Sequence, residues 1–330
     1  MAERRPPPPS ALAFRSAPSD DGTTLAAALR VRLPGQSWSA VRRLCETGKV
    51  RVNGELSTDP AARLGPAAEI TLDVAAPRPR VTVPGFAIVH EDPHLIVIEK
   101  PAGVASVPYA EKETGTAMDL IRADWRATGR RAHRQPLLVV HRLDKETSGL
   151  LCFAKTRLAE RGLHEVFQNH RASRFYLAVA EGVVAPGRIE SRLVQNRGDG
   201  LRGSTRNPRD LEGQQAVTHV EVLEALRDAT LCRVRLETGR THQIRIHLSE
   251  RGHPLVGDDV YCRDLLRSGR RPMPAERLML HAAHLGFVHP IDGKRLEFSA
   301  EPPPDFQRAV DRLRGGGDRP HPRPDGTGPR

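Results

Sequence analysis

The 330-residue sequence has few cysteines, and nothing in their arrangement predicts a disulfide framework or a zinc site. The four cysteines are scattered without a CxxC pair, and three lie in apolar or periodic runs, which is typical of reduced cysteines. No apolar run approaches ~18 residues, the length that predicts a membrane-spanning helix. The N-terminus carries two arginines with no apolar core after them, so a secretory signal is not expected. These absences predict a cytoplasmic protein with no membrane partner.

Signatures of cofactors and metals are missing as well. There is no glycine-rich loop followed by Lys-Ser/Thr and no GxGxxG fingerprint, so no cradle for a nucleotide cofactor is predicted. His281 and His284 are three residues apart, but nothing nearby has the spacing of a zinc site. We therefore expect neither a cofactor nor a metal.

Lysine is scarce too, because arginine supplies 45 of the 51 basic residues, against 40 acidic ones, for a formal net charge of +11. A positive balance of this size favours a polyanionic partner. Nucleic acid is favoured over a membrane, since no basic amphipathic helix stands out. A GC-rich genome, which favours arginine codons, would produce part of the same excess, so charge alone does not define the function.

The composition divides the chain into five segments. Residues 1–20 and 313–330 are rich in small residues, proline and arginine, and contain too few apolar side chains to offset the entropy of ordering, which predicts disordered tails. Between them we predict a small domain at 21–75, a proline-containing linker at 76–85 and a large domain at 86–312. A monomer is the default expectation.

The small domain begins with two predicted helices. In the second, SAVRRLCETG, three apolar residues (Val41, Leu44 and Cys45) recur at helical spacing on one face. That spacing leaves Arg42 and Arg43 on the opposite face.

A short alternating strand, KVRV, follows these helices, and Asn53-Gly54 closes a tight turn after it. Two helices followed by "GKVRVNG" resemble the alpha-L RNA-binding domain, the type shared by a small-subunit ribosomal protein and tyrosyl-tRNA synthetases. The resemblance implies a small α/β RNA-binding domain, with Arg42 and Arg43 among its RNA contacts. The alternative is a helix–hairpin module that contacts protein.

The large domain alternates apolar runs with helical patterns. The runs at 95–101, 137–140 and 150–154 are typical of central strands, 156–170 has a helical pattern, and 230–237 alternates with a period of two. These patterns predict an α+β fold around a mixed, largely antiparallel sheet flanked by helices and loops.

The segment VVHRLDKETSGLLCFAKT carries the strongest local signal. Two apolar strands flank a polar loop from His141 to Leu150, which holds Asp144 at the sheet edge. A loop anchored by buried strands on both sides is a good mount for a reactive group. A charged loop between strands is also typical of a solvated hairpin, so the pattern alone leaves both interpretations open.

"HRLDKETSGLL" is similar to the signature of the RluA family of pseudouridine synthases, and further stretches agree with that family in the same order. They are DPHLIVIEKPAGVASVP, SRFYLAVAEG, LETGRTHQIRIHLSERGHPLVGDDVY and LMLHAAHLGFVHPIDGKRLEFSAEPPPDF. The resemblance runs over 86–306. It implies the pseudouridine synthase fold and an RNA-modifying isomerase that needs no cofactor.

The resemblance also implies roles for single residues. Asp144 would be the catalytic carboxylate, and Arg245 would pair with it. Tyr176 would stack on the target base, with its hydroxyl placed to act as a proton acceptor or relay. Thr241 is expected to cap the helix that carries Arg245. The alternatives are a surface ion pair for Arg245 and a tyrosine packed in the core for Tyr176. The residues expected to bind substrate RNA in this domain are Arg142, Lys100, Arg240 and His242.

The predicted substrate is therefore a uridine in structured RNA. Large-subunit ribosomal RNA is expected, because family members with an added N-terminal RNA-binding domain often act there. Transfer RNA is an alternative substrate, and a non-catalytic RNA-binding or ribosome-assembly protein on the same fold is an alternative function. The sequence does not choose between addition of Asp144 to the sugar and a glycal route.

Overall fold

The computed structural model describes most of the chain. The described residues are 9–76, 83–109, 114–128, 135–205 and 213–315. Most of the predicted linker and the outer parts of both predicted tails lie outside these ranges. None of the helices within them combines the length and the apolar composition that spanning a bilayer requires.

The chain forms two compact units. One consists of residues 1–82 with 120–135, and the other of residues 83–119 with 136–330. The first break falls inside the predicted linker. The grouping of 120–135 with the first unit departs from the sequence prediction, which places them in the large domain.

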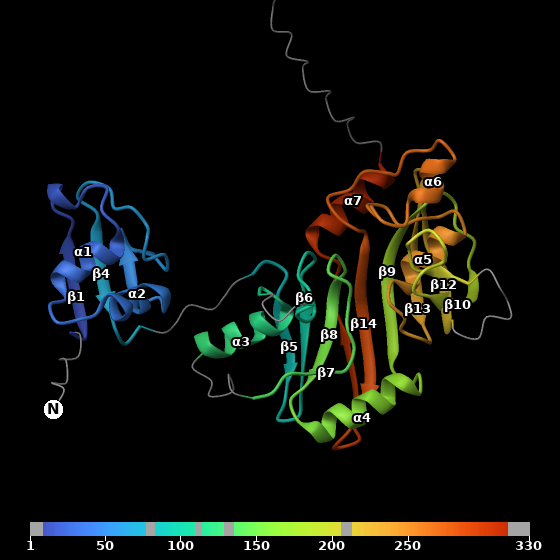
Figure 1. Ribbon diagram of the computed structural model, residues 1–330, viewed down its shortest axis with the longest axis horizontal. Coiled ribbons are helices and arrows are strands. Elements are labelled where there is room, and N and C mark those ends of the chain that lie inside the picture. Colours follow the sequence, from blue (N-terminus) through green and yellow to red (C-terminus); the bar gives the residue numbers. More distant parts are fainter. Residues whose placement is uncertain (1–8, 77–82, 110–113, 129–134, 206–212, 316–330) are drawn as a thin grey trace, which may run out of the picture. The chain divides into compact units, whose positions relative to one another are not determined.

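Residues 9–76 of the first unit form a four-stranded antiparallel sheet in the order β1-β4-β2-β3, together with two α-helices and a short 3-10 helix (Figure 1). Its elements are β1 (Ala11–Arg15), the 3-10 helix η1 (Pro18–Asp20), α1 (Leu25–Arg32), α2 (Trp38–Glu46), β2 (Val50–Val52), β3 (Glu55–Leu56) and β4 (Glu69–Asp73).

Strand β1 shows that the predicted disorder is wrong for residues 11–20. Leu12 and Phe14, which alternate along the strand, pack against the core of the unit. The backbone of β1 pairs antiparallel with β4, with Ala11 opposite Asp73. The prediction of disorder rested on the small residues and prolines of this segment and overlooked two apolar side chains spaced as in a strand. Two such side chains are sufficient to order a strand that adds to the edge of an existing sheet.

The predicted helices and hairpin of this unit are confirmed. Helix α2 begins where the Ser37 hydroxyl accepts a hydrogen bond from a backbone N–H of the first turn. Val41 and Cys45 are buried, and Arg42 and Arg43 are exposed on the opposite face. The turn between β2 and β3 has left-handed backbone at both of its residues, as an Asn-Gly hairpin requires.

The second unit contains an eleven-stranded sheet. Its main path is β11-β10-β12-β13-β9-β14-β8-β6-β5, with β15 added to β14 and β7 added to β8. Only the β8–β14 pair is parallel among the strands described, which confirms a mixed, largely antiparallel sheet. The strands are β5 (Ala87–Glu91), β6 (Leu95–Lys100), β7 (Leu138–Val139), β8 (Ser148–Ala154), β9 (Ser173–Glu181), β10 (Gly187–Val194), β11 (Gly203–Ser204), β12 (Gln214–Leu226), β13 (Ala229–Leu236), β14 (Leu280–Val288) and β15 (Arg295–Ser299).

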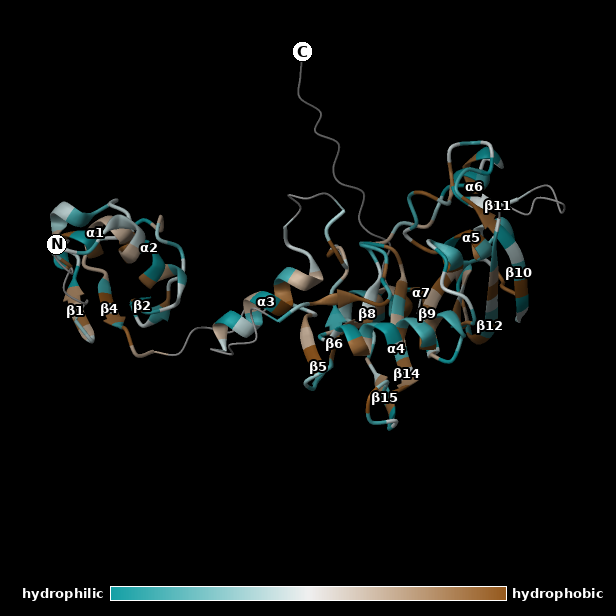
Figure 2. Ribbon diagram, turned by 60° about the horizontal axis from the view of Figure 1, so that its bottom comes forward, coloured by the Kyte–Doolittle hydropathy of each residue, from teal (hydrophilic) through white to brown (hydrophobic). Residues whose placement is uncertain are grey.

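Helices pack on this sheet through small clusters of apolar side chains. The helices are α4 (Arg157–Gln168), α5 (Gln243–Glu250), α6 (Arg263–Arg267) and α7 (Pro304–Arg314), while α3 (Ala117–Ala127) contains the boundary between the two units. Ala159 and Leu163 of α4 pack with residues of β6, β8 and β14, and Phe306 and Val310 of α7 pack with residues of β9 and β13. Figure 2 shows hydrophobic stretches along the strands and a mainly hydrophilic colour on α4.

One row of residues across the middle of the sheet fixes where the polar loop ends. Gly149 of β8 pairs with Ala282 of β14, Ala282 lies opposite Tyr176 of β9, and Tyr176 lies opposite Val234 of β13. A Cβ atom on Gly149 would lie 2.3 Å from the Ala282 carbonyl oxygen, and the residue has a φ of +112°. Only glycine fits there. The loop that carries Asp144 therefore joins the sheet at β8, with only β14 between it and the strand of Tyr176.

Candidate active site

Most of the predicted site residues of the second unit line one cavity of about 410 Å³. This volume is in the range of pockets that bind small molecules. The predicted site residues in its wall are Asp144, Tyr176, Arg245, Arg142, Arg240 and His242. The predicted acid, phenol and guanidinium thus converge on one cavity. Arg42 and Arg43 belong to the first unit and are exposed on α2.

The loop that carries Asp144 is fixed by buried polar contacts. The Ser106 hydroxyl donates to the Leu143 carbonyl at 2.8 Å and accepts from the Leu143 N–H at 3.0 Å. At the start of the loop, the His141 Nε2 atom accepts the Cys152 N–H at 3.0 Å. Burial lowers the pKa of His141 to about 3, so the ring is a neutral acceptor at physiological pH. These contacts hold the backbone on both sides of Asp144.

Lys100 does not take the substrate-contacting place predicted for it. The side chain is fully buried and is absent from the wall of the cavity. Its ammonium donates to the carbonyls of Pro101, Val104 and Lys145 at 2.7 to 3.0 Å. Burial lowers the pKa of Lys100 to about 7, but an amine that donates to three carbonyls must carry all three protons. Lys100 therefore ties the loop, through the Lys145 carbonyl, to the segment that follows β6.

The carboxylate of Asp144 is close to two polar side chains but accepts a hydrogen bond from neither. Its Oδ2 atom is 3.6 Å from Nη1 of Arg245, and its Oδ1 atom is 3.9 Å from Nε2 of His242. Burial lowers the pKa of His242, so this imidazole is neutral at physiological pH. No hydrogen bond to either carboxylate oxygen is present among the described residues, and 22% of the side chain is exposed. The oxygens of Asp144 are therefore free to meet a substrate.

Arg245 is held by an acid that the sequence analysis missed. Its Nε and Nη2 atoms donate to the two carboxylate oxygens of Asp258 at 2.7 and 2.8 Å. The same carboxylate accepts the backbone N–H groups of Val260 and Tyr261 at 2.9 Å. Burial would raise the pKa of Asp258, but the guanidinium and these N–H groups lower it. A bidentate pair fixes the guanidinium plane and leaves Nη1 directed at Asp144.

The start of α5 differs from the prediction that Thr241 caps it. The helix begins at Gln243, and its N-cap is His242, in a left-handed conformation with a φ of 59° and no capping side chain. The Gln243 side chain instead accepts the Arg240 N–H at 2.9 Å and the Thr238 hydroxyl at 2.8 Å. A non-glycine residue with positive φ at the edge of a cavity is a type of strain found at functional sites.

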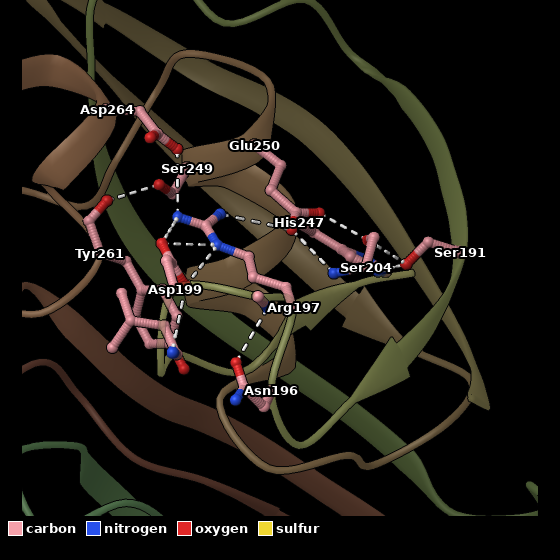
Figure 3. Close-up of polar contacts among 12 residues, drawn as sticks. Ser191, Asn196, Arg197, Asp199, Ser204, His247, Ser249, Glu250, Tyr261 and Asp264 are labelled. Carbon is pink, nitrogen blue, oxygen red and sulfur yellow. Dashed lines mark hydrogen bonds and ion pairs between the residues drawn. The ribbon is translucent and has the colours of Figure 1, made fainter. Parts of the chain in front are cut away.

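A polar network centred on Arg197 holds the segment after α5 in place (Figure 3). The Arg197 guanidinium lies 3.2 Å from the carboxylate of Asp264 in α6 and 3.6 Å from that of Glu250 at the end of α5. The Ser249 hydroxyl donates to the Tyr261 carbonyl at 2.5 Å. These contacts tie the chain that follows α5 back onto the helix. Asp258, which pairs with Arg245, lies in this segment between α5 and α6.

Tyr176 is buried in the sheet and still lines the cavity. Burial raises the pKa of its phenol, and the negative charge of Asp144 acts in the same direction. The phenol is therefore protonated at physiological pH.

The part of the chain that the structure describes contains no group of three or more metal-ligating side chains.

Comparisons with known proteins identify the family. Residues 94–250 match the model of the family described as RNA pseudouridylate synthase. The ribosomal large subunit pseudouridine synthase D of Zymomonas mobilis is 38% identical over 299 residues, which cover 87% of this chain and 92% of that protein. The chain belongs to the RluA family of RNA pseudouridine synthases.

Further RluA-family relatives and solved structures agree. The protein of the same name from Neisseria meningitidis is 36% identical over 310 residues, which cover 89% of this chain and 79% of that protein. The structure of human RNA pseudouridylate synthase domain containing 4 has a TM-score of 0.53 and 25% identity, covering 69% of this chain and 92% of that one. The predicted family, fold and isomerase class are confirmed.

We predict that Asp258→Ala destabilises this RluA-type synthase. The change leaves the buried guanidinium of Arg245 without its bidentate partner, which is expected to lower the free energy of unfolding by about 3–5 kcal/mol. Differential scanning calorimetry measures this as a lower Tm. The control is Asp259→Ala, which removes the adjacent, exposed acid. Equal Tm values for the two variants would contradict the role given to Asp258.

Proposed function

We propose that this RluA-type synthase isomerises uridines in large-subunit ribosomal RNA, with Asp144 as its catalytic carboxylate. The observation that carries the proposal is the convergence of Asp144, Tyr176 and Arg245 on one cavity. The relatives from Zymomonas mobilis and Neisseria meningitidis are named for the large ribosomal subunit, which supports ribosomal RNA as the substrate.

The reaction moves one bond within a single nucleotide. The bond from N1 of uracil to C1′ of ribose breaks, the uracil rotates, and a new bond forms between C5 and C1′. The proton on C5 then leaves, and N1, which has lost its bond to ribose, takes up a proton. Nothing is exchanged with a second substrate, so we propose that the enzyme needs no cofactor.

Asp144 suits the first step because its carboxylate is near the Arg245 guanidinium but accepts no hydrogen bond among the described residues. A carboxylate with free lone pairs can add to C1′ as a nucleophile or remove the proton from C2′ so that uracil leaves and a glycal forms. Arg245, which Asp258 holds in place, orients the Asp144 carboxylate. The nearest guanidinium nitrogen, Nη1, is 3.6 Å from Oδ2 of Asp144 and forms no hydrogen bond with it. Both routes use this arrangement.

Tyr176 suits the positioning of the base. Its ring forms part of the cavity wall, where an aromatic face can stack on an extruded uracil. The raised pKa keeps the phenol protonated, so the hydroxyl begins as a donor to a uracil carbonyl. Removal of the C5 proton in the last step then falls to water, or to the tyrosine oxygen as part of a relay.

The remaining predicted residues of the cavity suit RNA binding. Arg142 is exposed in the wall and can fill the space that the base leaves in the RNA. Arg240 and His242 lie at the start of α5, where they can contact the flipped nucleotide. In the first unit, the exposed Arg42 and Arg43 can contact phosphates, as the resemblance to the alpha-L domain implies. The four cysteines are free and buried, which fits a cytoplasmic location.

We predict that Asp144→Asn lowers the rate of isomerisation by about 10²- to 10⁴-fold or more, because an amide neither adds to C1′ nor accepts a proton efficiently. The measurement is release of tritium from RNA that carries tritium at C5 of uridine. The matched control is Glu146→Gln, which neutralises an exposed acid of the same loop and should leave the rate within about threefold. An Asp144→Asn rate close to that of the control would remove Asp144 from the mechanism.

The substrate is tested with the unmodified enzyme. We predict release of tritium from a transcript of large-subunit ribosomal RNA, and none above background from bulk transfer RNA transcripts at the same uridine concentration. Primer extension after carbodiimide treatment then locates the modified uridine. Release from transfer RNA alone would replace the ribosomal assignment, and no release from either RNA would favour a binding protein on the same fold.

We predict that the double variant Arg42→Gln/Arg43→Gln binds the ribosomal transcript more weakly than the wild type. The loss of two phosphate contacts should reduce the slope of log affinity against log salt by about 1 to 2, while the rate at saturating enzyme is unchanged. Fluorescence anisotropy at several KCl concentrations measures this slope. The control is Arg63→Gln, an exposed arginine of the same unit outside α2. Equal slopes in both variants would exclude an RNA contact by α2.

A further inference from the structure

One arginine of the cavity, Arg174, has no part in the mechanism above. It lies on β9 two residues before Tyr176, so both side chains leave the same face of the strand, and both line the cavity. Only 7% of Arg174 is exposed. Its Nη2 atom donates to the Glu237 carbonyl at 2.9 Å, and the guanidinium carbon is 5.6 Å from the centre of the Phe167 ring.

The chain around Arg174 leaves room for the guanidinium. A Cβ atom on Gly239 would lie 2.5 Å from Nη1 of Arg174, so a larger residue at 239 would displace this side chain. The turn that precedes α5 therefore leaves space for the guanidinium of Arg174 only because residue 239 is glycine.

Arg174 lacks the counter-charge that other buried arginines of this unit possess. Arg245 pairs with Asp258, and Arg277 pairs with Asp305 at 2.6 Å. No carboxylate oxygen lies within 4.0 Å of Arg174 among the described residues, and its buried Nε atom has no hydrogen-bond partner there. Burying a guanidinium without an anion is unfavourable, and a neutral carbonyl compensates only part of that.

The wall of the cavity as a whole also has more positive than negative charge. Among the described residues that line the cavity are four arginines, at positions 142, 174, 240 and 245, but a single carboxylate, that of Asp144. Arg245 is already neutralised by the carboxylate of Asp258 behind it. The like charges of the other three would be relieved by an anion that enters with the substrate.

We propose that Arg174 forms a phosphate-binding subsite of the cavity and receives a backbone phosphate of the RNA strand that carries the target uridine. A phosphodiester supplies the full negative charge that the site lacks, and its two non-bridging oxygens match the donors of a guanidinium. A uracil carbonyl would satisfy the free Nε–H but would leave the charge uncompensated. The subsite holds the nucleotide by its phosphate while Tyr176, on the same strand, contacts the base.

This proposal rests on the catalytic role given to the cavity, and the test separates the two. Binding is measured in an Asp144→Asn background, where the RNA is not turned over. The probe is a synthetic stem-loop that spans the uridine located by primer extension. Arg174→Gln in this background should bind about 10- to 100-fold more weakly and reduce the salt slope by about 1. Arg174→Lys keeps the charge and should recover part of the affinity and the salt slope.

The matched control is Arg235→Gln. Arg235 is exposed on β13 and lies opposite Phe175, so it leaves the face of the sheet opposite to Arg174. The substitution Arg235→Gln removes one positive charge from the same unit, as Arg174→Gln does, and should change the affinity for the stem-loop by less than threefold.

Methylphosphonate substitution locates the contact. A neutral methylphosphonate at the phosphate 5′ or 3′ of the target should weaken binding by the Asp144→Asn protein. It should add little loss in the Asp144→Asn/Arg174→Gln protein, because the same contact is already missing. Additive losses at both phosphates would overturn the proposal.

Two further outcomes would also overturn it. Unchanged affinity and salt slope for Arg174→Gln, with slower single-turnover isomerisation in the otherwise wild-type enzyme, would assign the guanidinium to the uracil. If Arg174→Gln fails to fold, the methylphosphonate series on the Asp144→Asn protein decides, and no loss at either phosphate rejects the subsite. A failure of the catalytic proposal is recognised separately, because Asp144→Asn would then retain activity.

Discussion

The close approach of Gly149 to Ala282 is the constraint on which the active site depends. Because a Cβ atom at 149 would lie 2.3 Å from the Ala282 oxygen, β8 and β14 can pair only around a glycine. Ala282 also lies opposite Tyr176, so the same row of the sheet sets how far the loop with Asp144 lies from the tyrosine. A shift of one residue in either strand would turn alternate side chains to the other face and separate the acid from the phenol.

Arg245 divides its interactions unequally between two acids, and this inequality suits the chemistry. Asp258 takes two short hydrogen bonds in a buried, bidentate pair, whereas Asp144 is reached only at 3.6 Å. The first contact fixes the guanidinium, and the second orients the reactive carboxylate without occupying its oxygens. If Asp258 were absent, the guanidinium could move onto Asp144 and reduce its reactivity. The structural pair therefore protects the reactive one.

The strands and the polar loop could be predicted from the sequence, because they depend on local patterns of apolar residues. The family motifs also brought Asp144, Tyr176 and Arg245 together, although they lie on different elements. Asp258 was missed because its partner is chosen by the packing of the chain after α5, which no local pattern encodes. Lys100 was misplaced for a related reason, since three backbone carbonyls gather around it only in the folded sheet.

Two buried cations of the second unit, Lys100 and Arg245, have partners within the fold, whereas a third, Arg174, has no anionic partner among the described residues. Lys100 is satisfied by carbonyls and Arg245 by a carboxylate, so neither adds much free positive charge to the cavity. Arg174 is buried as deeply but is left without an anion. A folded protein retains such a group only if the rest of the structure holds it there, and here Glu237 and the turn at Gly239 do so. The energy that binding the anion releases can then help to draw the nucleotide out of the RNA stack, which itself costs a few kcal/mol.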